Sequence, residues 1–347
     1  MMRVLVIKTS SMGDIIHTLP ALTDAARVHP DIIFDWVVEE NFAEIPRWHS
    51  HVDRVIPVAI RRWRKNIFSR KTFAEVRDFF KTLRLQQYDL VIDAQGLMKS
   101  ALLTRFSKGL RCGLDNKSAR EPRASWFYQK QFFVDKNQHA ITRVRQLFAK
   151  ILQYPCPGQV PEYGIDKQKL MTANHERYLV FLHGTTWATK HWPEENWMAL
   201  GKKINAAGFN IKLPWGNTEE RQRAQRIAGQ CKADVLPRLG LVEIAKVLAG
   251  AAAIVAVDTG LGHLAAAFNI PTISLYGPTN PVLTGALGES QIHLASDYHC
   301  APCLKKECAI DKISVTPPCF NALGIGVVWE ELNSLLERAQ KNTCYTT

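Results

Sequence analysis

Short apolar runs alternate with helix-like segments along most of the chain. The first half contains VLVIK, IIFDWVVEE, HVDRVIPV and LQQYDLVIDAQG, and the second half contains ERYLVFLHGTT, FNIKLPWG, KADVLPRL, AAIVAVDTG and PTISLYGP. Runs that are rich in Val and Ile, and that do not alternate with polar residues, are typical of strands buried on both faces of a parallel sheet. The alternation therefore predicts the α/β class, with two doubly wound parallel sheets in one chain.

A segment rich in Pro and Gly separates the two halves. Residues 154–164, YPCPGQVPEYG, contain three Pro and two Gly, a composition that neither a helix nor a central strand tolerates. We therefore expect one domain in residues 1–160 and a second in residues 161–326. In the remaining segment, residues 327–347, Leu332, Leu335 and Leu336 share one face. This predicts a terminal amphipathic helix, which can pack back on the first domain.

The net charge of +12 is concentrated in the first half of the chain. Residues 1–165 contain 26 Lys and Arg against 16 Asp and Glu, whereas residues 166–347 contain 18 against 16. A basic surface raises the local concentration of anionic partners such as nucleic acid, anionic lipid or a phosphorylated sugar. An ordinary solvated basic face explains the excess equally well.

No stretch of the sequence is apolar for long enough to predict a membrane span. The longest candidate, residues 247–257, has eleven residues and ends at Asp258, whereas a span needs about 20. The first residues lack the apolar core and small-residue cleavage site of a secretory signal. We therefore expect a cytoplasmic protein.

The loop after the first predicted strand, KTSSMGD, ends in a carboxylate. It matches neither the GxGxxG dinucleotide pattern nor the phosphate-binding P-loop. Asp14 precedes an apolar periodic segment, so its commonest role would be the N-cap of that helix. The functional alternative is a general base. A single carboxylate at the ligand-binding edge of a parallel sheet can take the proton of a hydroxyl that attacks the anomeric carbon of a sugar.

Two loops of the second half suit a phosphorylated ligand. In AVDTGLGHL a buried strand ends and a helix is expected to start within DTG, where backbone amides and the helix dipole favour an anion. In FLHGTTWATKHW two hydroxyls and an ammonium follow a strand, which suits a diphosphate. A capped helix with a buried His, and an ordinary polar loop, explain the two patterns equally well. The residues concerned are Asp258, Thr259, Gly260 and His263 in the first loop, and Thr185, Thr186 and Lys190 in the second.

Basic residues recur in two further segments of the first half. Lys99 falls in the first turn of a predicted helix, where the dipole disfavours a cation, so a bound anion would explain it. The segment PVAIRRWRKNIFSRKTF mixes basic and aromatic residues, and its apolar positions have helical spacing. Such a helix suits a membrane surface, nucleic acid or an acidic saccharide, or it is a solvated face. Its residues include Arg61, Arg62, Arg64 and Lys65 among the basic ones, and Ile60, Trp63 and Ile67 among the apolar ones.

Four of the eight cysteines lie close together in the sequence. They have the spacing C-x2-C-x4-C-x10-C within HCAPCLKKECAIDKISVTPPC. The first pair has a spacing typical of zinc ligands and the second pair does not, so free thiols and a structural metal site are both open. The cysteines are Cys300, Cys303, Cys308 and Cys319.

Taken together, the motifs resemble those of the lipopolysaccharide heptosyltransferases, which are glycosyltransferases of family 9 with the GT-B fold. The resemblance rests on KTSSMGDIIHTLPALTDA, FDWVVEENFAEIPRWH, VIPVAIRRWRK, VIDAQGLMKSALL, SAREP, TKHWPEENW, LPWG and VDTGLGHLAAA. It implies two Rossmann-like domains that face a central cleft, with the acceptor on the first and the nucleotide sugar on the second. The first 65 residues are similar to type I members, which transfer L-glycero-D-manno-heptose from ADP-heptose to Kdo on lipid A. The cysteine-rich segment is more like type II members, which use a different acceptor.

The resemblance also implies roles for individual residues. Asp14 corresponds to the general base of the family, which deprotonates the acceptor hydroxyl as ADP leaves with inversion. The implied donor-site residues are Thr185, Thr186 and Lys190 near the diphosphate, Glu220 near the ribose or adenosine, and Asp258, Thr259, Gly260 and His263 in the donor loop. The residues that would face the anionic acceptor are Arg61, Arg62, Arg64, Lys65, Lys99 and Arg120.

The resemblance implies partners as well. They are ADP-heptose, Kdo-bearing lipid A, and the anionic cytoplasmic face of the inner membrane as a peripheral contact. No catalytic metal, other cofactor or nucleic acid is implied. Two other classes of protein stay open on the residues alone. A nicotinamide-dependent oxidoreductase would explain paired Rossmann-like domains but lacks GxGxxG, and a non-catalytic binder of acidic glycolipid or nucleic acid would explain the basic first half.

Overall fold

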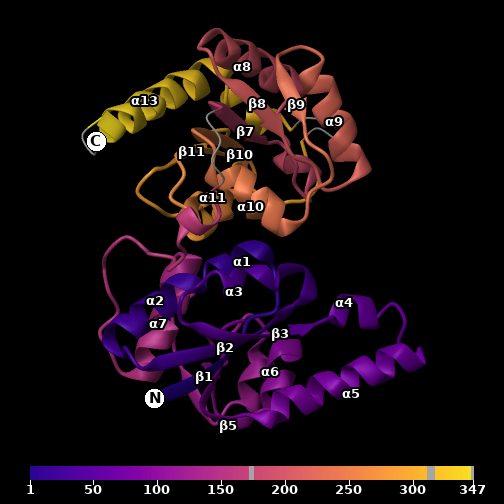
Figure 1. Ribbon diagram of the computed structural model, residues 1–347, viewed down its shortest axis with the longest axis vertical. Helices are drawn as coiled ribbons and strands as arrows, with labels where there is room; N and C mark the ends of the chain where they lie inside the picture. The colour runs from indigo at the N-terminus through magenta and orange to yellow at the C-terminus, as the bar shows by residue number, and fades with distance from the viewer. Residues whose placement is uncertain (172–175, 311–316, 345–347) are drawn as a thin grey trace. The chain divides into compact units, whose positions relative to one another are not determined.

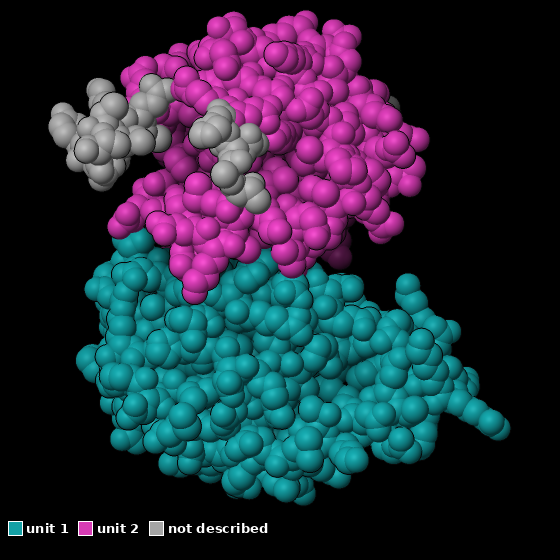
Figure 2. Space-filling model, viewed as in Figure 1, with its two compact units in different colours: residues 1–165 teal, residues 166–347 magenta. Residues whose placement is uncertain are grey.

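The computed structural model describes residues 1–171, 176–310 and 317–344, with side chains described as far as residue 338. The chain divides into two compact units, Met1–Ile165 and Asp166–Thr347 (Figure 2). Each unit contains one parallel six-stranded sheet with helices packed against it (Figure 1). The predicted α/β class with two parallel sheets is confirmed. Residues 154–164 form neither helix nor strand in the structure.

The first unit has the strand order β3-β2-β1-β4-β5-β6. Its strands are β1 (Met2–Ile7), β2 (Ile32–Glu39), β3 (Val52–Val58), β4 (Gln87–Asp93), β5 (Lys108–Leu114) and β6 (Lys130–Phe132). Its α-helices are α1 (Met12–Ile16), α2 (Leu19–Val28), α3 (Glu44–Arg47), α4 (Ile60–Trp63), α5 (Arg70–Leu85), α6 (Met98–Arg105) and α7 (Ala140–Leu152).

Helices cover both faces of the first sheet. This arrangement buries the apolar side chains that β1 carries on both of its faces. Leu5 and Ile7 belong to a core that also contains residues of α5 and α6. On a strand, successive side chains point to opposite faces, so Val4 and Val6 face the other side. On that side α2 packs against α7, and the ring of Phe34 lies 6.3 Å from that of Phe148.

The second unit has the strand order β12-β11-β10-β7-β8-β9. Its strands are β7 (Tyr178–Leu182), β8 (Asn210–Leu213), β9 (Ala233–Val235), β10 (Ala253–Val257), β11 (Thr272–Tyr276) and β12 (Gln291–Ala295). Its α-helices are α8 (Glu194–Ala206), α9 (Thr218–Ala228), α10 (Leu241–Ala249), α11 (Gly260–Ala267), α12 (Pro281–Thr284) and α13 (Ile325–Cys344).

The terminal helix α13 packs within the second unit, beside α8 (Figure 1). Leu332, Leu335 and Leu336 are buried in the same core as Phe181 of β7 and Trp197 of α8. The amphipathic helix expected from the sequence therefore exists, and its leucine face is occupied by this core. Packing of the tail on the first unit stays a prediction.

Both sheets contain strands that the sequence pattern did not reveal. These are β5, β6 and β12, which are polar or contain Gly and therefore lack the apolar signal of a central strand. Gly113 in β5 has a packing role, because a Cβ there would lie 2.4 Å from Cε2 of Tyr128. The missing side chain lets the Tyr128 hydroxyl donate to Oδ2 of Asp93, 2.6 Å away, at the end of β4.

The strand order reverses next to β1 in the first sheet and next to β7 in the second. At such a reversal the loops leaving two neighbouring strands diverge, and ligands bind in the crevice at the carboxyl ends of those strands. The loops concerned follow β1 and β4 in the first unit, and β7 and β10 in the second. We therefore expect the ligand-binding residues in these loops, which are residues 8–14, 94–99, 183–190 and 258–263.

One local prediction is wrong. The spacing of Ile60, Trp63 and Ile67 predicted a single amphipathic helix, but α4 ends at Trp63 and α5 begins at Arg70. Trp63 packs against the core of the first unit, whereas Ile67 is 65% exposed. Among the described residues, no helix is both long and apolar enough to cross a membrane.

A buried ion pair joins α2 to α7, and it provides a test of this packing. The Nε of Arg145 donates to Oδ2 of Asp24 at 2.6 Å, and both side chains are almost fully buried. Arg145→Gln should lower the free energy of unfolding by about 3–5 kcal/mol, because it leaves an uncompensated buried carboxylate. Urea unfolding should be followed together with hydrogen exchange of the α2 and α7 amides. Arg77→Gln, which removes an exposed pair with Asp78, is the control and should change stability by at most about 0.5 kcal/mol.

Candidate active site

Asp14 lies in the first turn of α1, at the reversal point of the first sheet. The N-cap of α1 is Ser11, and Asp14 is the third helical residue, so the prediction that Asp14 is itself the N-cap is wrong. Its Oδ2 accepts hydrogen bonds from the backbone N of Ser11 at 2.9 Å and from the Ser11 hydroxyl at 2.8 Å. The short chain of Asp can reach back to the cap from this position. Asp14 thus stabilises the start of α1 from inside the helix.

The carboxylate of Asp14 keeps one oxygen with spare capacity to accept a proton. Its Oδ1 lies 4.0 Å from Nζ of Lys8, beyond hydrogen-bond distance, and the Asp14 side chain is 39% exposed. Burial acts to raise the pKa of Asp14, but Lys8, the two bonds from Ser11 and Arg120 outweigh it and lower that pKa. Asp14 is therefore ionised at neutral pH and partly open to solvent.

Lys8 is the neighbour that sequence reasoning missed. It ends the apolar run of β1 and is 7% exposed, and its ammonium donates to the carbonyl of Ala94 at 2.9 Å. Burial lowers the pKa of Lys8, while the carboxylates of Asp14 and Asp93 act in the opposite direction. A lysine directly after a buried strand, six residues before an aspartate, was the available signal.

The loop after β4 brings Lys99 to the same edge. Its Nζ donates to the hydroxyl of Ser10 at 3.2 Å. Lys99 lies in the first turn of α6, as predicted, and an anionic ligand beside it stays a prediction. The Oε2 of Glu121 accepts from the backbone N of Met98 at 2.6 Å. The Glu121 amide also donates to Gly96 O, so Arg120 is held next to this loop.

The basic residues predicted to face the acceptor substrate differ in their partners within the protein. Arg62 forms ion pairs with Glu40 at 3.0 Å and with Glu75 at 2.7 Å, so its charge is already matched. The guanidinium of Arg61 lies over the ring of Phe42, at 5.6 Å from the centroid. Arg64 and Lys65 are exposed, and neither has an ion pair with any described residue. Both therefore remain available to an anionic ligand.

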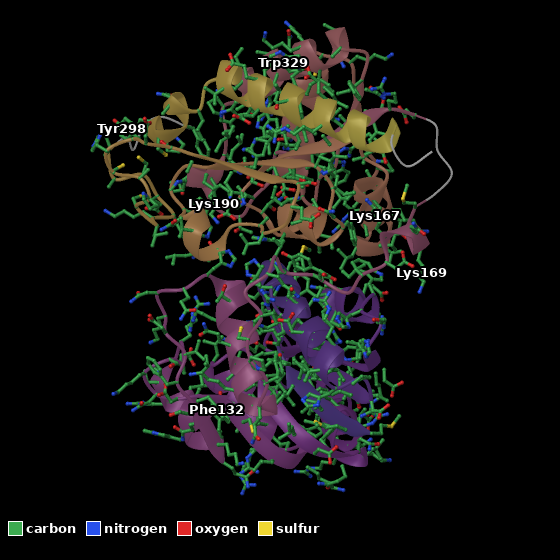
Figure 3. All side chains as sticks on the ribbon, turned by 90° about the vertical axis from the view of Figure 1, so that its left-hand side faces the viewer. Phe132, Lys167, Lys169, Lys190, Tyr298 and Trp329 are labelled. Carbon is green, nitrogen blue, oxygen red and sulfur yellow. The ribbon has the colours of Figure 1, made fainter. Side chains whose placement is uncertain are left out.

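In the second unit, four of the predicted donor-site residues meet between the ends of β7 and β10. The ammonium of Lys190 donates to Oδ2 of Asp258 at 2.7 Å. His263 Nε2 lies 4.0 Å from the other oxygen of Asp258, and the Thr185 hydroxyl donates to the Asp258 carbonyl at 3.1 Å. Figure 3 shows Lys190 in this unit, on a different element from Trp329 of α13.

The helix α11 starts directly beside this cluster. Thr259 is its N-cap and Gly260 its first residue, as the sequence predicted. The amides of the first turn of a helix have no intrahelical partner and carry the positive end of the dipole. Lys190 and the start of α11 together provide a place where a phosphate group can be bound. Thr186 follows Thr185 in the same loop and is exposed.

Glu220 lies in the same unit as this cluster, but its hydrogen-bond partners are other residues. Its Oε2 accepts from the backbone N of Gly216 at 2.7 Å, and its own amide is capped by Asn217 Oδ1 at 2.9 Å. A Cβ on Gly184 would lie 2.6 Å from Cδ of Glu220. The glycine after β7 therefore lets the first turn of α9 approach the loop that contains Thr185.

Two histidines near this cluster are neutral. Burial and Arg223 lower the pKa of His183 to about 3 and that of His191 to about 4. Sequence reasoning also missed Trp187, whose ring lies 4.4 Å from Nζ of Lys190 and 5.7 Å from Nζ of Lys306. A lysine three residues after a tryptophan is only a weak indication in the sequence that the two side chains are in contact. Lys306 is too distant in sequence for its contact with Trp187 to be predicted.

The cysteine-rich segment reaches the same loops. The Thr189 hydroxyl donates to the carbonyl of Lys305 at 2.8 Å, and the Leu304 amide donates to Pro278 O. Cys300, Cys303, Cys308 and Cys319 are free thiols. Within residues 1–171, 176–310 and 317–344 no group of three or more His, Cys, Asp or Glu is arranged to hold a metal ion. A metal at these cysteines stays a prediction, which metal analysis of the purified protein would test.

Each unit thus has charged groups at the reversal point of a Rossmann-like sheet, and this organisation is that of a two-domain glycosyltransferase. Residues 76–314 match the sequence profile of glycosyltransferase family 9 (heptosyltransferase). The chain belongs to this family. It is an enzyme, and its function is that of a type I heptosyltransferase of lipopolysaccharide biosynthesis. The oxidoreductase and the non-catalytic binder are therefore set aside.

Individual relatives agree with this assignment. The chain is 57% identical to lipopolysaccharide heptosyltransferase 1 of Pseudomonas aeruginosa, over 96% of this chain and 98% of the relative. It is similar to the solved structure of E. coli heptosyltransferase WaaC with ADP, with a TM-score of 0.86 and 46% identity over 96% of this chain and 100% of that one. WaaC with ADP-2-deoxy-2-fluoro heptose gives a TM-score of 0.80 and 47% identity, over 93% and 98%.

The contact of Gly184 with Glu220 can be tested directly. Gly184→Ala should push the Glu220 carboxylate away from Gly216, and loss of one hydrogen bond should speed exchange of the Gly216 amide roughly fivefold. Amide hydrogen exchange of the whole chain is the measurement. Gly324→Ala, where a Cβ meets nothing within 4 Å, is the control. Unchanged protection at Gly216 in the Gly184→Ala variant would contradict the arrangement.

Proposed function

We propose that the protein transfers L-glycero-D-manno-heptose from ADP-heptose to a hydroxyl of Kdo on lipid A, with inversion at the anomeric carbon. The observation that carries the proposal is the carboxylate of Asp14. It is ionised, partly exposed, and keeps Oδ1 without a hydrogen bond to the described residues at the ligand-binding edge of the first sheet. The family and the similarity to WaaC bound to ADP and to an ADP-heptose analogue support the choice of donor.

In this mechanism Asp14 Oδ1 takes the proton of the attacking Kdo hydroxyl. The hydroxyl oxygen forms a bond to the anomeric carbon as the bond between that carbon and the ADP oxygen breaks. The electron pair of the broken bond leaves with ADP. One base is sufficient for this chemistry, because inversion takes place in a single displacement. Oδ2, occupied by Ser11, fixes the orientation of the carboxylate.

The second unit would bind the donor. Lys190 and the first-turn amides of α11 are suited to the diphosphate, since positive groups there offset the charge that develops on departing ADP. An ammonium has three hydrogens, so Lys190 can keep its bond to Asp258 and donate to a phosphate as well. Thr185, Thr186, Thr259, Gly260 and His263 would line the same site, and Glu220 would bind the ribose or adenosine. The mechanism requires no divalent cation.

The first unit would bind the acceptor, in line with the domain assignment from the sequence. The exposed cations Arg64 and Lys65, with Arg61, Lys99 and Arg120, would face its anionic groups. Arg62 would act by orienting the segment, because its guanidinium is already paired with Glu40 and Glu75. The acceptor is a membrane lipid, so the protein would work as a peripheral protein at the cytoplasmic face of the inner membrane.

Incubation of the protein with ADP-heptose and Kdo-bearing lipid A should yield one heptosylated product by mass spectrometry, also in the presence of EDTA. Asp14→Asn should lower kcat at least about 100-fold, because the base is lost, while ADP affinity stays unchanged. The control is Asp31→Asn, at an exposed aspartate of the same unit. Near wild-type activity of the Asp14→Asn variant would contradict the role of Asp14. A product formed only from lipid A that already carries a heptose would indicate a type II acceptor.

The pH profile tests the partnership of Lys8 with Asp14. Asp14 acts as a base only when ionised, so kcat/KM falls as pH falls through its pKa. Lys8→Met removes the positive neighbour that lowers this pKa, and burial then raises it. The acidic limb of kcat/KM should therefore move to higher pH. Lys108→Met, at an exposed lysine on β5, should leave the limb in place. A uniform loss of activity at all pH values in the Lys8→Met variant would show that Lys8 acts only through the fold.

A further inference from the structure

The segment between α4 and α5 exposes large apolar side chains that nothing in the first unit covers. Phe68 is 99% exposed and Ile67 65% exposed, and Phe73 in the first turn of α5 is 73% exposed. Figure 1 shows this connection projecting from the side of the unit. Single exposed apolar residues are common on soluble proteins, but three of them within seven residues at a projecting loop are not.

This connection and the helices on either side of it, α4 and α5, carry a large share of the net positive charge of the protein. Residues 61–85 contain nine Lys and Arg and only two acidic residues, Glu75 and Asp78. Both acidic side chains are ion-paired, with Arg62 and Arg77 respectively. The basic residues on either side of Ile67 and Phe68 therefore have few internal counter-charges. They include Arg64, Lys65, Arg70 and Lys71, all of them exposed.

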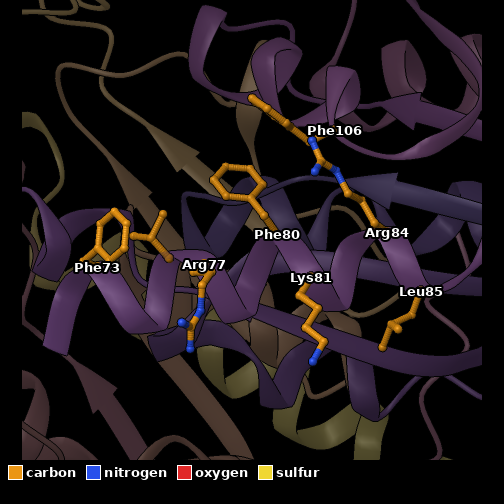
Figure 4. A pocket seen from close by; sticks show the side chains of 8 residues that line it. Phe73, Arg77, Phe80, Lys81, Arg84, Leu85 and Phe106 are labelled. Carbon is orange, nitrogen blue, oxygen red and sulfur yellow. The ribbon is translucent and has the colours of Figure 1, made fainter. Parts of the chain in front are cut away.

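An open groove of about 700 Å³ continues this surface along α5 (Figure 4). Phe80 and Phe106 pack together, with their ring centroids 4.5 Å apart, and the guanidinium of Arg84 lies 5.5 Å from the centroid of Phe106. Phe73, Val76 and Leu85 add apolar lining, while Arg77, Lys81 and Arg84 supply positive groups. Apolar and basic side chains are thus interspersed along one side of the helix.

We propose that this surface, Arg64–Phe73 with the α5 groove, docks the enzyme on an anionic phospholipid bilayer. Ile67, Phe68 and Phe73 would enter the boundary between headgroups and acyl chains, and the surrounding cations would contact the lipid phosphates. Exposed aromatic residues within a basic segment are the combination that binds such an interface. The inference rests on the proposed function, because an acceptor held in a bilayer by its acyl chains requires its enzyme to work at that surface.

Charge complementarity selects this occupant over a second copy of the chain. Two such surfaces would bring together two segments with the same strong positive charge, and like charges repel. A bilayer rich in phosphatidylglycerol presents the opposite charge over a wide area. The attraction acts within a Debye length, about 8 Å at physiological ionic strength, so binding depends on salt.

The test is co-sedimentation of the full chain with vesicles. Wild-type protein should bind vesicles of phosphatidylglycerol and phosphatidylcholine at least about tenfold better than vesicles of phosphatidylcholine alone. The double variant Ile67→Ser, Phe68→Ser should lower binding to the anionic vesicles at least about tenfold, because it removes the inserted side chains. Arg70→Gln with Lys71→Gln should lower binding and weaken its salt dependence. Phe133→Ser, at a 55% exposed phenylalanine after β6, is the matched control and should bind like wild type.

Activity with a deacylated, water-soluble Kdo acceptor separates this inference from the proposed function. The double variant Ile67→Ser, Phe68→Ser should keep wild-type kcat/KM on the soluble acceptor and lose activity on acceptor embedded in vesicles. No wild-type binding to anionic vesicles, equal losses for the Phe133→Ser control, or full binding by the double variant would each overturn the inference. A dimer in solution that the double variant dissociates would overturn it in favour of a second copy. Failure of transfer to both acceptors by wild type would instead contradict the proposed function.

Discussion

The reversal of strand order beside β1 and beside β7 determines where charged side chains of each unit can meet. Because neighbouring parallel strands end at the same edge, residues 86 positions apart in the first unit, such as Thr9 and Gln95, become hydrogen-bonded partners. In the second unit Lys190 and Asp258 meet in the same way. The cores beneath these edges are largely apolar on both faces, which favours the ends of the strands as the place where these polar groups meet.

Asp14 combines a structural and a chemical role in one carboxylate. Oδ2 holds the start of α1 through Ser11, and Oδ1 is left facing Lys8. The capping bonds and the ammonium stabilise the charged form, which keeps the group ionised but also lowers its strength as a base. A carboxylate with a low pKa has to gain its efficiency from position, because proton transfer in the transition state requires a base within hydrogen-bond reach of the acceptor hydroxyl.

The basic residues of the first half fall into groups with different roles. Arg62, Arg145 and Arg3 are paired with carboxylates of the same unit and hold its elements together. Lys8 is buried beside Asp14. A third group, Arg64, Lys65, Arg70 and Lys71, is exposed and surrounds apolar side chains on a projecting segment. Net charge alone could not separate these groups, because it counts a paired arginine and a free one equally.

The sequence by itself determined the two parallel sheets, the helix start at Asp258–Gly260 and the family, because apolar strands, capping residues and motifs are local patterns. It did not reveal β5, β6 or β12, which form from polar or Gly-containing residues only because a neighbouring strand offers hydrogen bonds. It placed Asp14 at the cap rather than inside the first turn and joined α4 to α5, since caps and turns depend on competing bonds such as those to Ser11. Only the tertiary structure decided that Lys8 faces Asp14, that Glu121 caps α6 and that Phe68 stays exposed. The first depends on the bond from Lys8 to the distant Ala94, and the second on the approach of Glu121 to Met98. The third depends on the absence of packing against Phe68.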